Sequence, residues 1–178
     1  EAGIDFANLP DTEPDDPFAE YTGAGVIFGV TGGVTEAVIR HVLGTVTTEQ
    51  IASVAECGVR GLEGIKAFEV KAGDLTLKIA VASGLGNADK LIEKIESGEE
   101  FFHFVEIMAC PGGCIGGGGQ PEACFEQKKL RNEGMFIADE DCTLRSSEQN
   151  TALDGVYNLL RGRAHDLLHV HYPDHGHE

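Results

Sequence analysis

The stretch Phe104–Pro121, FVEIMACPGGCIGGGGQP, decides the fold, because an apolar run stops there at a cysteine and a glycine-rich bend follows. Six of the eight residues from 112 to 119 are glycine. The run before Cys110 has the length and apolar character of a buried strand, and Pro111 has no N–H with which to continue a ladder. We therefore expect Cys110 at the end of a strand, where the chain leaves the sheet.

The spacing of the two cysteines in this stretch favours a metal site. Three residues separate Cys110 from Cys114, and two of them are glycine. Such a bend can direct both sulfurs at one centre and turn several backbone N–H groups toward it. This arrangement suits an inorganic cluster with sulfide acceptors.

Three other interpretations remain open from the spacing alone. A disulfide across the bend is disfavoured by the odd number of cysteines and the lack of a disulfide framework. A phosphate loop at 116–119 lacks the Gly-Lys-Ser/Thr that should follow it. A zinc site needs two further ligands, and the usual second pair is absent. The spacing therefore indicates an iron–sulfur or other thiolate metal site without deciding between them.

An earlier glycine-bracketed segment, residues 23–33, adds a second candidate element of the site. We expect a short apolar strand there, then a glycine turn, then a helix with Val34, Ala37, Val38 and Val42 on its inner face. Backbone N–H groups at such a helix start can meet anionic ligands, here sulfide or cyanide. Many α/β proteins use the same turn for packing alone.

The remaining periodicities predict an α/β fold, with a mostly parallel sheet flanked by helices on both faces. Helices are expected at 48–56, after Asn87, from Pro121 through Lys128, at 150–160 and at 163–170, and strands at 65–71, 75–82 and 101–108, the last of these central. We expect a single lobe over residues 1–178, with an acidic extended segment at 1–20 and a His-rich tail at 171–178.

The composition limits the kinds of partner and the compartment that are expected for the chain. The chain has 178 residues, 42% of them hydrophobic, which suits one globular domain, and a net charge of −17. A surface so acidic argues against nucleic acid or an anionic membrane, although the charge is also explained by solubility alone. No segment approaches the roughly 20 consecutive apolar residues of a membrane span. Five cysteines, an odd number, indicate a reducing compartment and thus the cytoplasm.

Other cysteines and histidines are interpreted as structural. Cys57 and Cys124 read as small core residues, as does Cys142, which we place in an acidic loop over residues 139–142. His165 and His169 share one helix face and could bind metal, but a surface helix with a polar end explains them better.

The glycine-rich stretch closely resembles the third cysteine motif of the [FeFe] hydrogenases. That motif reads Met-Ala-Cys-Pro-Gly-Gly-Cys, two variable residues, then Gly-Gly-Gly-Gln-Pro, and residues 108–121 match it with Ile115 and Gly116 in the variable places. The resemblance implies that Cys110 is a terminal ligand of a [4Fe-4S] cubane. It also implies that Cys114 both ligates the cubane and bridges to a diiron centre, and that Met108 lies beside that centre.

The earlier segment strengthens this resemblance. Its order Thr-Gly-Ala-Gly-Val-Ile-Phe-Gly, one residue, Thr-Gly-Gly-Val, one residue, Glu-Ala is similar to the family's sequence between its second and third cysteine motifs. The resemblance implies that Phe28 and Gly29 line the diiron pocket. Thr35 stands where methionine is common, a difference that we attribute to helical packing.

The resemblance covers essentially the whole chain, but only the C-terminal half of the family's active-site domain. The first two cysteine motifs are absent, and in the family they supply the other two cubane ligands, a proton-donating cysteine and a cyanide-binding lysine. The chain opens at Glu1 without methionine, so we interpret it as a processed subunit or an excised piece. A complementary lobe or subunit is therefore an expected partner.

The expected function of the assembled protein is the reversible reduction of protons to hydrogen. The implied cofactors are the [4Fe-4S] cubane and a diiron subcluster with carbonyl, cyanide and a dithiolate bridge, together called the H-cluster. The implied catalytic set is Cys114, Met108 and Phe28, with electrons from ferredoxin or an NAD-linked flavoprotein subunit. The alternative is a hydrogenase-like [4Fe-4S] scaffold or sensor without catalysis.

Overall fold

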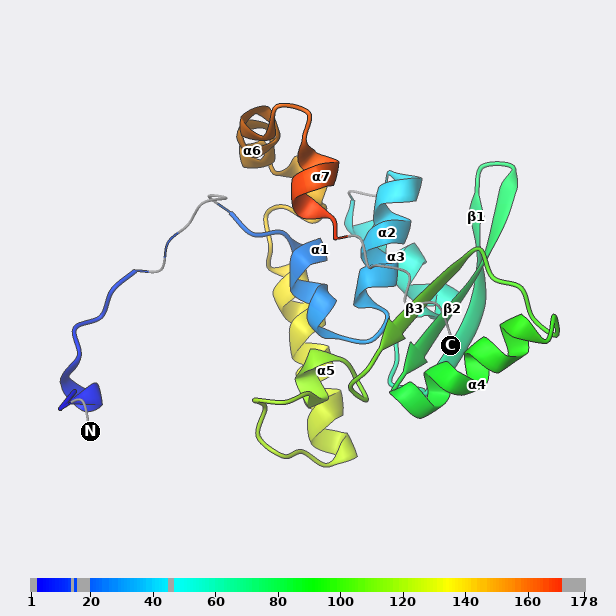
Figure 1. Cartoon of the computed structure of the whole chain (residues 1–178), viewed down its shortest axis with the longest axis horizontal. Coiled ribbons are helices and arrows are strands. Elements are labelled where there is room, and N and C mark those ends of the chain that lie inside the picture. The colour runs from blue at the N-terminus through cyan, green and yellow to red at the C-terminus, as the bar shows by residue number, and fades with distance from the viewer. Residues whose placement is uncertain (1–2, 14, 16–19, 45–46, 171–178) are drawn as a thin grey trace, which may run out of the picture. The chain divides into compact units, whose positions relative to one another are not determined.

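The computed structural model describes residues 3–13, 15, 20–44 and 47–170, and these fall into two units (Figure 1). The larger unit runs from Tyr21 to Thr151 and holds the sheet and both candidate site segments. The smaller unit combines the described parts of 1–20 and 152–178. Residues 171–178, where the sequence suggests a His-rich tail, lie outside the described residues, as does part of the acidic segment.

The sheet of the larger unit is mixed. It consists of β1 (Ile65–Ala72), β2 (Leu75–Ser83) and β3 (Phe104–Met108) in the order β1-β2-β3. β1 and β2 form an antiparallel hairpin closed by Gly73, which has a φ of +62°, and β2 pairs with β3 in parallel. The α/β class is confirmed, but the expectations of a mostly parallel sheet and of a central β3 are wrong. The hairpin supplies two of the three described strands and makes β2 central.

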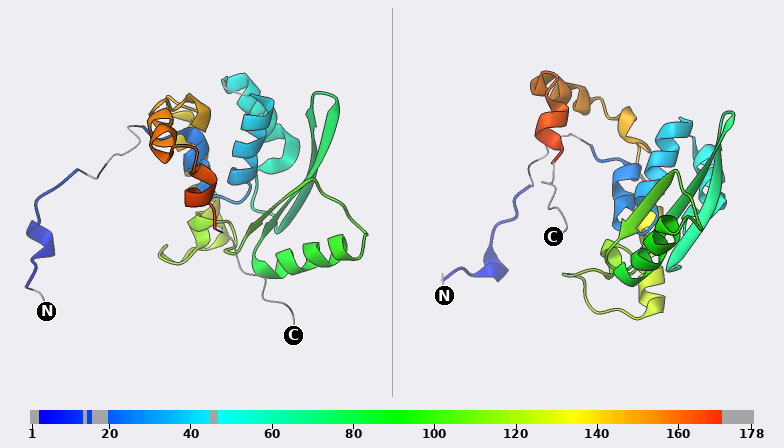
Figure 2. Two further views of the ribbon diagram at one scale, coloured as in Figure 1. Left: turned by 45° about the horizontal axis from the view of Figure 1, so that its top comes forward. Right: turned by 45° about the vertical axis from the view of Figure 1, so that its right-hand side comes forward.

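Helices cover both faces of this sheet, as expected (Figure 2). The helices are α1 (Gly23–Val26), α2 (Gly33–Leu43), α3 (Thr48–Val54), α4 (Leu85–Glu96) and α5 (Phe125–Glu140), with α6 (Ala152–Leu160) and α7 (Ala164–Leu168) in the smaller unit. On one face, Ile79 packs with Ile39 of α2 and Val54 of α3. On the other face, Ala80 and Ala82 pack against α4. The alternation along β2 thus divides its side chains between two helical layers.

The expected strand before α2 is a helix instead. Residues 23–26 form α1 and residues 27–29 a 3-10 turn, and the side chain of Thr22 accepts a hydrogen bond from the N–H of Gly25. A short apolar run fits either a strand or a buried helix, and here the Thr22 cap favours the helix. α2 then begins after Gly32, as the glycine turn suggests.

Local capping explains the ends of several other helices. Thr47 and Gln50 form a capping box at the start of α3, which passes into a single π-helical turn over Ala55–Val59. Gly44, with a φ of +61°, ends α2. α5 begins at Phe125, after Cys124 as its N-cap, rather than at Pro121 as expected.

The inner face of α2 differs from the expected one. Val42 is exposed, and Val34, Ala37 and Val38 are only half-buried, whereas Thr35, Glu36, Ile39 and Arg40 are buried. Hydrophobic spacing alone therefore selects the wrong stripe of this helix. The reason is that charged partners from elsewhere in the chain meet Glu36 and Arg40 inside the fold.

Candidate metal centre

The cysteine loop, residues 109–121, leaves the sheet at the end of β3, where the sequence predicts it. In the parallel register Met108 lies opposite Ser83 of β2, and Cys110 follows two residues later. Cys114 begins a short 3-10 turn that ends at Gly116.

Backbone hydrogen bonds fold this loop through consecutive tight turns. The N–H of Gly113 donates to the carbonyl of Cys110 at 2.9 Å, and the N–H of Gly117 donates to the carbonyl of Cys114 at 3.2 Å. Gly112 and Gly113 have φ values of +91° and +87°, in the left-handed region that side chains disfavour. The turns therefore place both cysteines on one compact bend.

Glycines allow close contacts at this bend, most strictly at Gly113. A Cβ on Gly113 would lie 2.9 Å from the carbonyl oxygen of Gly29 and 2.9 Å from the amide nitrogen of Thr31. A Cβ on Gly117 would lie 3.2 Å from the sulfur of Cys110. The bend thus packs backbone against backbone on the 27–31 turn and folds over one of its own thiols.

Polar groups tie the loop to that turn and to β2. The N–H of Gly112 donates to Ser83 Oγ at 2.8 Å, and the hydroxyls of Thr31 and Ser83 lie 3.3 Å apart. The N–H of Thr31 donates to the carbonyl of Gly112 at 3.2 Å. Thr31 and Ser83 are buried, so water does not compete for these bonds.

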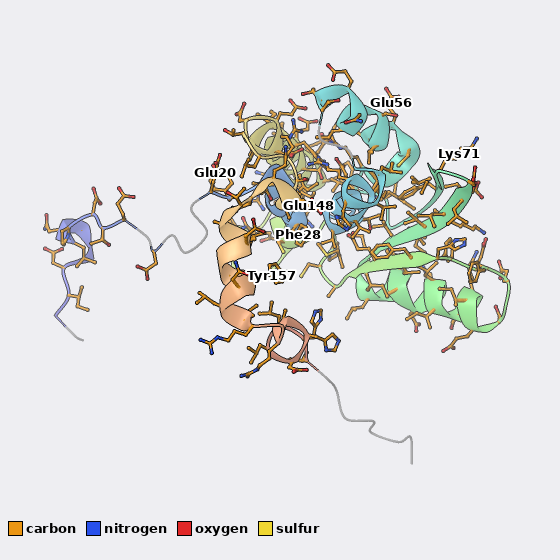
Figure 3. The ribbon with its side chains drawn as sticks, turned by 90° about the horizontal axis from the view of Figure 1, so that it is seen from above. Glu20, Phe28, Glu56, Lys71, Glu148 and Tyr157 are labelled. Carbon is orange, nitrogen blue, oxygen red and sulfur yellow. The ribbon has the colours of Figure 1, made fainter. Side chains whose placement is uncertain are left out.

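The sequence-predicted pocket residues lie on these two segments. Phe28, labelled in Figure 3, is 48% exposed on the turn after α1. Gly29 follows it, and a Cβ there would lie 2.7 Å from the Cε of Met135 in α5. Met108 is half-buried at the end of β3. The contact of Gly113 with Gly29 brings the two segments together.

The five cysteines all lie among the described residues, and none forms a disulfide. Cys110 is half-buried and Cys114 is exposed. Cys57 packs against the core, and burial raises the pKa of its thiol, as expected for a structural residue. Cys124 is exposed, contrary to the expected core position, and Cys142 donates to the carbonyl of Ala138.

The donor set fits one half of an iron–sulfur site. Cys110 and Cys114 offer two thiols on one glycine-rich bend, and thiolates are the ligands that hold iron–sulfur clusters. Within the described ranges, no three His, Cys, Asp or Glu side chains lie close enough together to hold a metal ion. The rings of His165 and His169 stack with centroids 4.9 Å apart.

Two residues that the sequence does not single out support the site segments: Arg131 bonds to the loop and Glu106 to the start of α2. Arg131 of α5 donates to the carbonyl of Ile115 at 2.8 Å and to that of Pro121 at 3.0 Å. Glu106, buried in the apolar run of β3, accepts hydrogen bonds from Gly32 and Thr35. A charged residue inside an apolar strand is the signal that could have identified Glu106.

A buried charge cluster, made of Glu36, Arg40, Arg60, Asp139 and Arg145, holds α2 to α5. Arg40 donates to both oxygens of Asp139, at 2.9 and 2.6 Å, and to Glu36 at 2.6 Å. Arg145 donates to both oxygens of Asp139, and Arg60 to both oxygens of Glu36. Asp139 therefore lies in α5 with 0% exposure, and its expected place in an acidic loop is wrong.

This cluster shifts two pKa values. Burial alone raises the pKa of Asp139, but hydrogen bonds and charges from Arg40 and Arg145 outweigh burial and bring it below the usual 3.8. Burial opposes the charged form of Arg40, whose pKa is nevertheless raised by hydrogen bonds and charges from Asp139 and Glu36. Both groups are thus held in their ionised forms.

Among the residues that the structure describes, no helix combines the length and the apolar character needed to cross a membrane.

Two family models match the chain along its length. The model described as "Iron only hydrogenase large subunit, C-terminal domain" matches residues 1–118. The model described as "Iron hydrogenase small subunit" matches residues 125–175. Their boundary falls just after the cysteine loop.

Individual hydrogenases are similar over nearly the whole chain. The NADP-reducing hydrogenase subunit HndD of Solidesulfovibrio fructosivorans is 46% identical over 176 residues, covering 95% of this chain and 30% of that protein. Iron hydrogenase 1 of Clostridium pasteurianum is 39% identical over 183 residues, covering 97% of this chain and 32% of that protein. A solved [FeFe]-hydrogenase from Chlamydomonas reinhardtii matches with a TM-score of 0.64 and 36% identity, over 96% of this chain and 51% of the other.

The chain spans about a third of the length of these two curated relatives. The large-subunit model nevertheless covers well over half of the chain, and the fold matches a solved [FeFe]-hydrogenase. The chain therefore belongs to the iron-only hydrogenase large-subunit family.

Proposed function

We propose that this chain forms one wall of the active site of an [FeFe] hydrogenase that reversibly reduces protons to hydrogen. The observation that carries the proposal is the packing of the cysteine loop on the 27–31 turn, with Gly112 and Gly113 at the contacts between the two backbones. This packing places Cys110 and Cys114 on the same bend, next to the segment that bears Phe28 and Gly29. The match to the large-subunit family supports the assignment.

In this proposal the residues of the chain have distinct roles. Cys110 and Cys114 supply two thiolates to a [4Fe-4S] cubane, and Cys114 also connects the cubane to the diiron subcluster. Phe28, Gly29 and Met108 exclude water from the pocket of that subcluster and shield its carbonyl, cyanide and dithiolate groups. When bound, the H-cluster supplies the electron transfer and the iron chemistry of the reaction.

The remaining ligands come from a complementary lobe or subunit. A cubane takes four ligands, and this loop offers two. The chain covers 30% of the NADP-reducing relative, which leaves ample chain length for a second wall. We propose ferredoxin or an NAD-linked flavoprotein subunit as the electron carrier, and the cytoplasm, where free thiols persist, as the compartment.

The proposal is tested with the complete hydrogenase that contains this chain, matured anaerobically with its diiron subcluster. We expect infrared bands of metal-bound carbonyl and cyanide and four cubane irons. We also expect the protein to evolve hydrogen from protons when a chemical reductant supplies the electrons. The Cys114→Ala variant is expected to lose the infrared bands and the activity. The matched control is Cys124→Ala, which changes an exposed thiol ten residues further along the chain and should retain both.

Other outcomes would decide against the enzyme. A matured protein that holds a cubane but shows no carbonyl or cyanide bands would favour the [4Fe-4S] scaffold or sensor. A protein that binds neither iron nor sulfide would contradict both functions.

A further inference from the structure

A buried carboxylate connects the two segments that form the proposed pocket. Glu106 lies in β3, two residues before Met108, and is 6% exposed. Its Oε1 accepts a hydrogen bond from the N–H of Gly32 at 2.7 Å. Its Oε2 accepts one from the N–H of Thr35 at 2.8 Å and one from the Thr35 hydroxyl at 2.6 Å.

These bonds satisfy the start of α2 from a distant strand. Gly32, the N-cap, has no side chain with which to satisfy the first N–H groups of the helix. Glu106, 74 residues further along the chain, supplies the missing acceptor. Its negative charge also lies at the positive end of the helix dipole, which favours it there. The burial of this charge is therefore compensated by three donors, and losing any of them carries a cost.

A buried cation lies close to the same turn. A Cβ on Gly32 would lie 3.1 Å from Lys66 Nζ, and this ammonium donates to the carbonyls of Val59 and Gly61. Burial lowers the pKa of Lys66, while the charge of Glu106 is among those that oppose this shift. The start of α2 thus lies near both a carboxylate, which bonds to it, and an ammonium group, which bonds to the neighbouring 59–61 segment.

Both segments that Glu106 connects also carry residues of the proposed pocket. The turn held by Glu106 continues directly from Phe28 and Gly29, and the strand that bears Glu106 runs into Met108 and Cys110. We propose that Glu106 is a positioning residue that sets the separation between these two walls of the diiron pocket. This inference rests on the proposed function.

Thr35 bonds to Glu106 through its side chain as well as its backbone. The resemblance to the family suggests methionine at this position, and helical packing was the expected reason for the difference. The structure shows instead that the Thr35 side chain is 0% exposed and that its hydroxyl makes the shortest of the three bonds to Glu106. A methionine would provide the N–H bond but not the hydroxyl bond. The Thr35 hydroxyl therefore adds a third hydrogen bond between the start of α2 and Glu106.

Three variants of the matured complete hydrogenase test this role. Glu106→Gln replaces one acceptor oxygen by an NH₂ group that faces N–H donors. Thr35→Val keeps the shape of the side chain and removes only the hydroxyl, whereas Thr35→Ser keeps the hydroxyl. Two exposed positions in the same sheet, Glu69→Gln in β1 and Thr76→Val in β2, are matched controls.

The measured quantities are the infrared frequencies of carbonyl and cyanide, the cubane iron content and the turnover rate. Since a displacement of about 1 Å costs up to about 100-fold in rate, we expect Glu106→Gln to lower turnover at least tenfold and to shift the infrared bands. Cubane iron should remain at the wild-type level. Thr35→Val should shift the bands in the same direction but less, and Thr35→Ser and both controls should match the wild type.

The outcomes separate the inference from the function on which it rests. Wild-type bands in Glu106→Gln, or equal bands in Thr35→Val and Thr35→Ser, would overturn the positioning role while leaving the hydrogenase intact. If Glu106→Gln does not fold, the two Thr35 variants decide, because each keeps the carboxylate and both backbone bonds. A wild-type protein without carbonyl and cyanide bands would overturn the proposed function and this inference together.

Discussion

The cysteine loop and the buried charge cluster are held in place by different means. The loop meets the 27–31 turn through a backbone hydrogen bond and through a glycine that allows close approach, and the side chains of Ser83, Ile115 and Arg131 add to this. The charge cluster holds α2 through long side chains, three Arg and two carboxylates, joined by short hydrogen bonds. One region is therefore fixed largely by close backbone contacts, and the other by ion pairs between charged side chains.

The largest effect should come from breaking the charge cluster at its centre. Asp139→Asn leaves Arg40 and Arg145 without their shared carboxylate, and losing one partner of a buried ion pair costs about 3–5 kcal/mol. We expect a loss of this size in the free energy of unfolding, measured by urea titration. Glu140→Gln changes an exposed neighbour on the same helix and should be close to neutral. Equal midpoints for the two variants would contradict the role given to the cluster.

A smaller effect should come from adding one methyl group to the loop. Gly113→Ala puts a Cβ 2.9 Å from the backbone of Gly29 and Thr31 at a φ of +87°, and we expect a loss of about 2–3 kcal/mol. Gly119→Ala has a similar φ of +89° but nothing within 4 Å of its Cβ, so only the cost of the left-handed backbone, about 1–2 kcal/mol, applies.

The comparison of these two glycines isolates the close approach of the loop to the turn. Urea titrations give the stability, and anaerobic iron analysis of the complete protein gives the cubane content. Gly119→Ala should keep its cubane and Gly113→Ala should not. Equal iron content in both variants would show that the loop does not need this contact.

The contrast between the two regions also explains how far the sequence could be interpreted. The bend around Cys110 and Cys114 can be predicted from the sequence because glycine, proline and cysteine act through local geometry. The hairpin 65–83 can be predicted because its apolar residues alternate with polar ones. Local pattern therefore sufficed for the bend, for β1–β3 and for the presence of most helices, but not for the segment 23–29, which is helical.

Long-range pairing could not be inferred in this way. The sequence suggests an acidic loop at Asp139, because its partners Arg40 and Arg145 adjoin it only after folding. The same carboxylate explains why Gly23 is glycine, since a Cβ there would lie 2.0 Å from Asp139 Oδ1. The role of Glu106 cannot be inferred from local pattern for the same reason, because its donors lie more than 70 residues earlier.

The smallest effect should appear on mild acidification. In the folded protein the pKa of Asp139 lies below the usual 3.8, so its charge stabilises the fold above that pH. This contribution is lost as the pH falls through the folded pKa. We expect the free energy of unfolding to decline below about pH 4 more steeply in the wild type than in Asp139→Asn. Parallel curves between pH 3 and 6 would contradict the assignment.

The central claim is that Cys110 and Cys114 together bind iron. Anaerobic crystals of the complete hydrogenase, with diffraction data collected on both sides of the iron absorption edge, test it most directly. The account predicts anomalous iron density at bonding distance from both sulfurs, with none at Cys57, Cys124 or Cys142. Iron density bonded to neither sulfur of the loop, in a protein that contains a cubane, would contradict it.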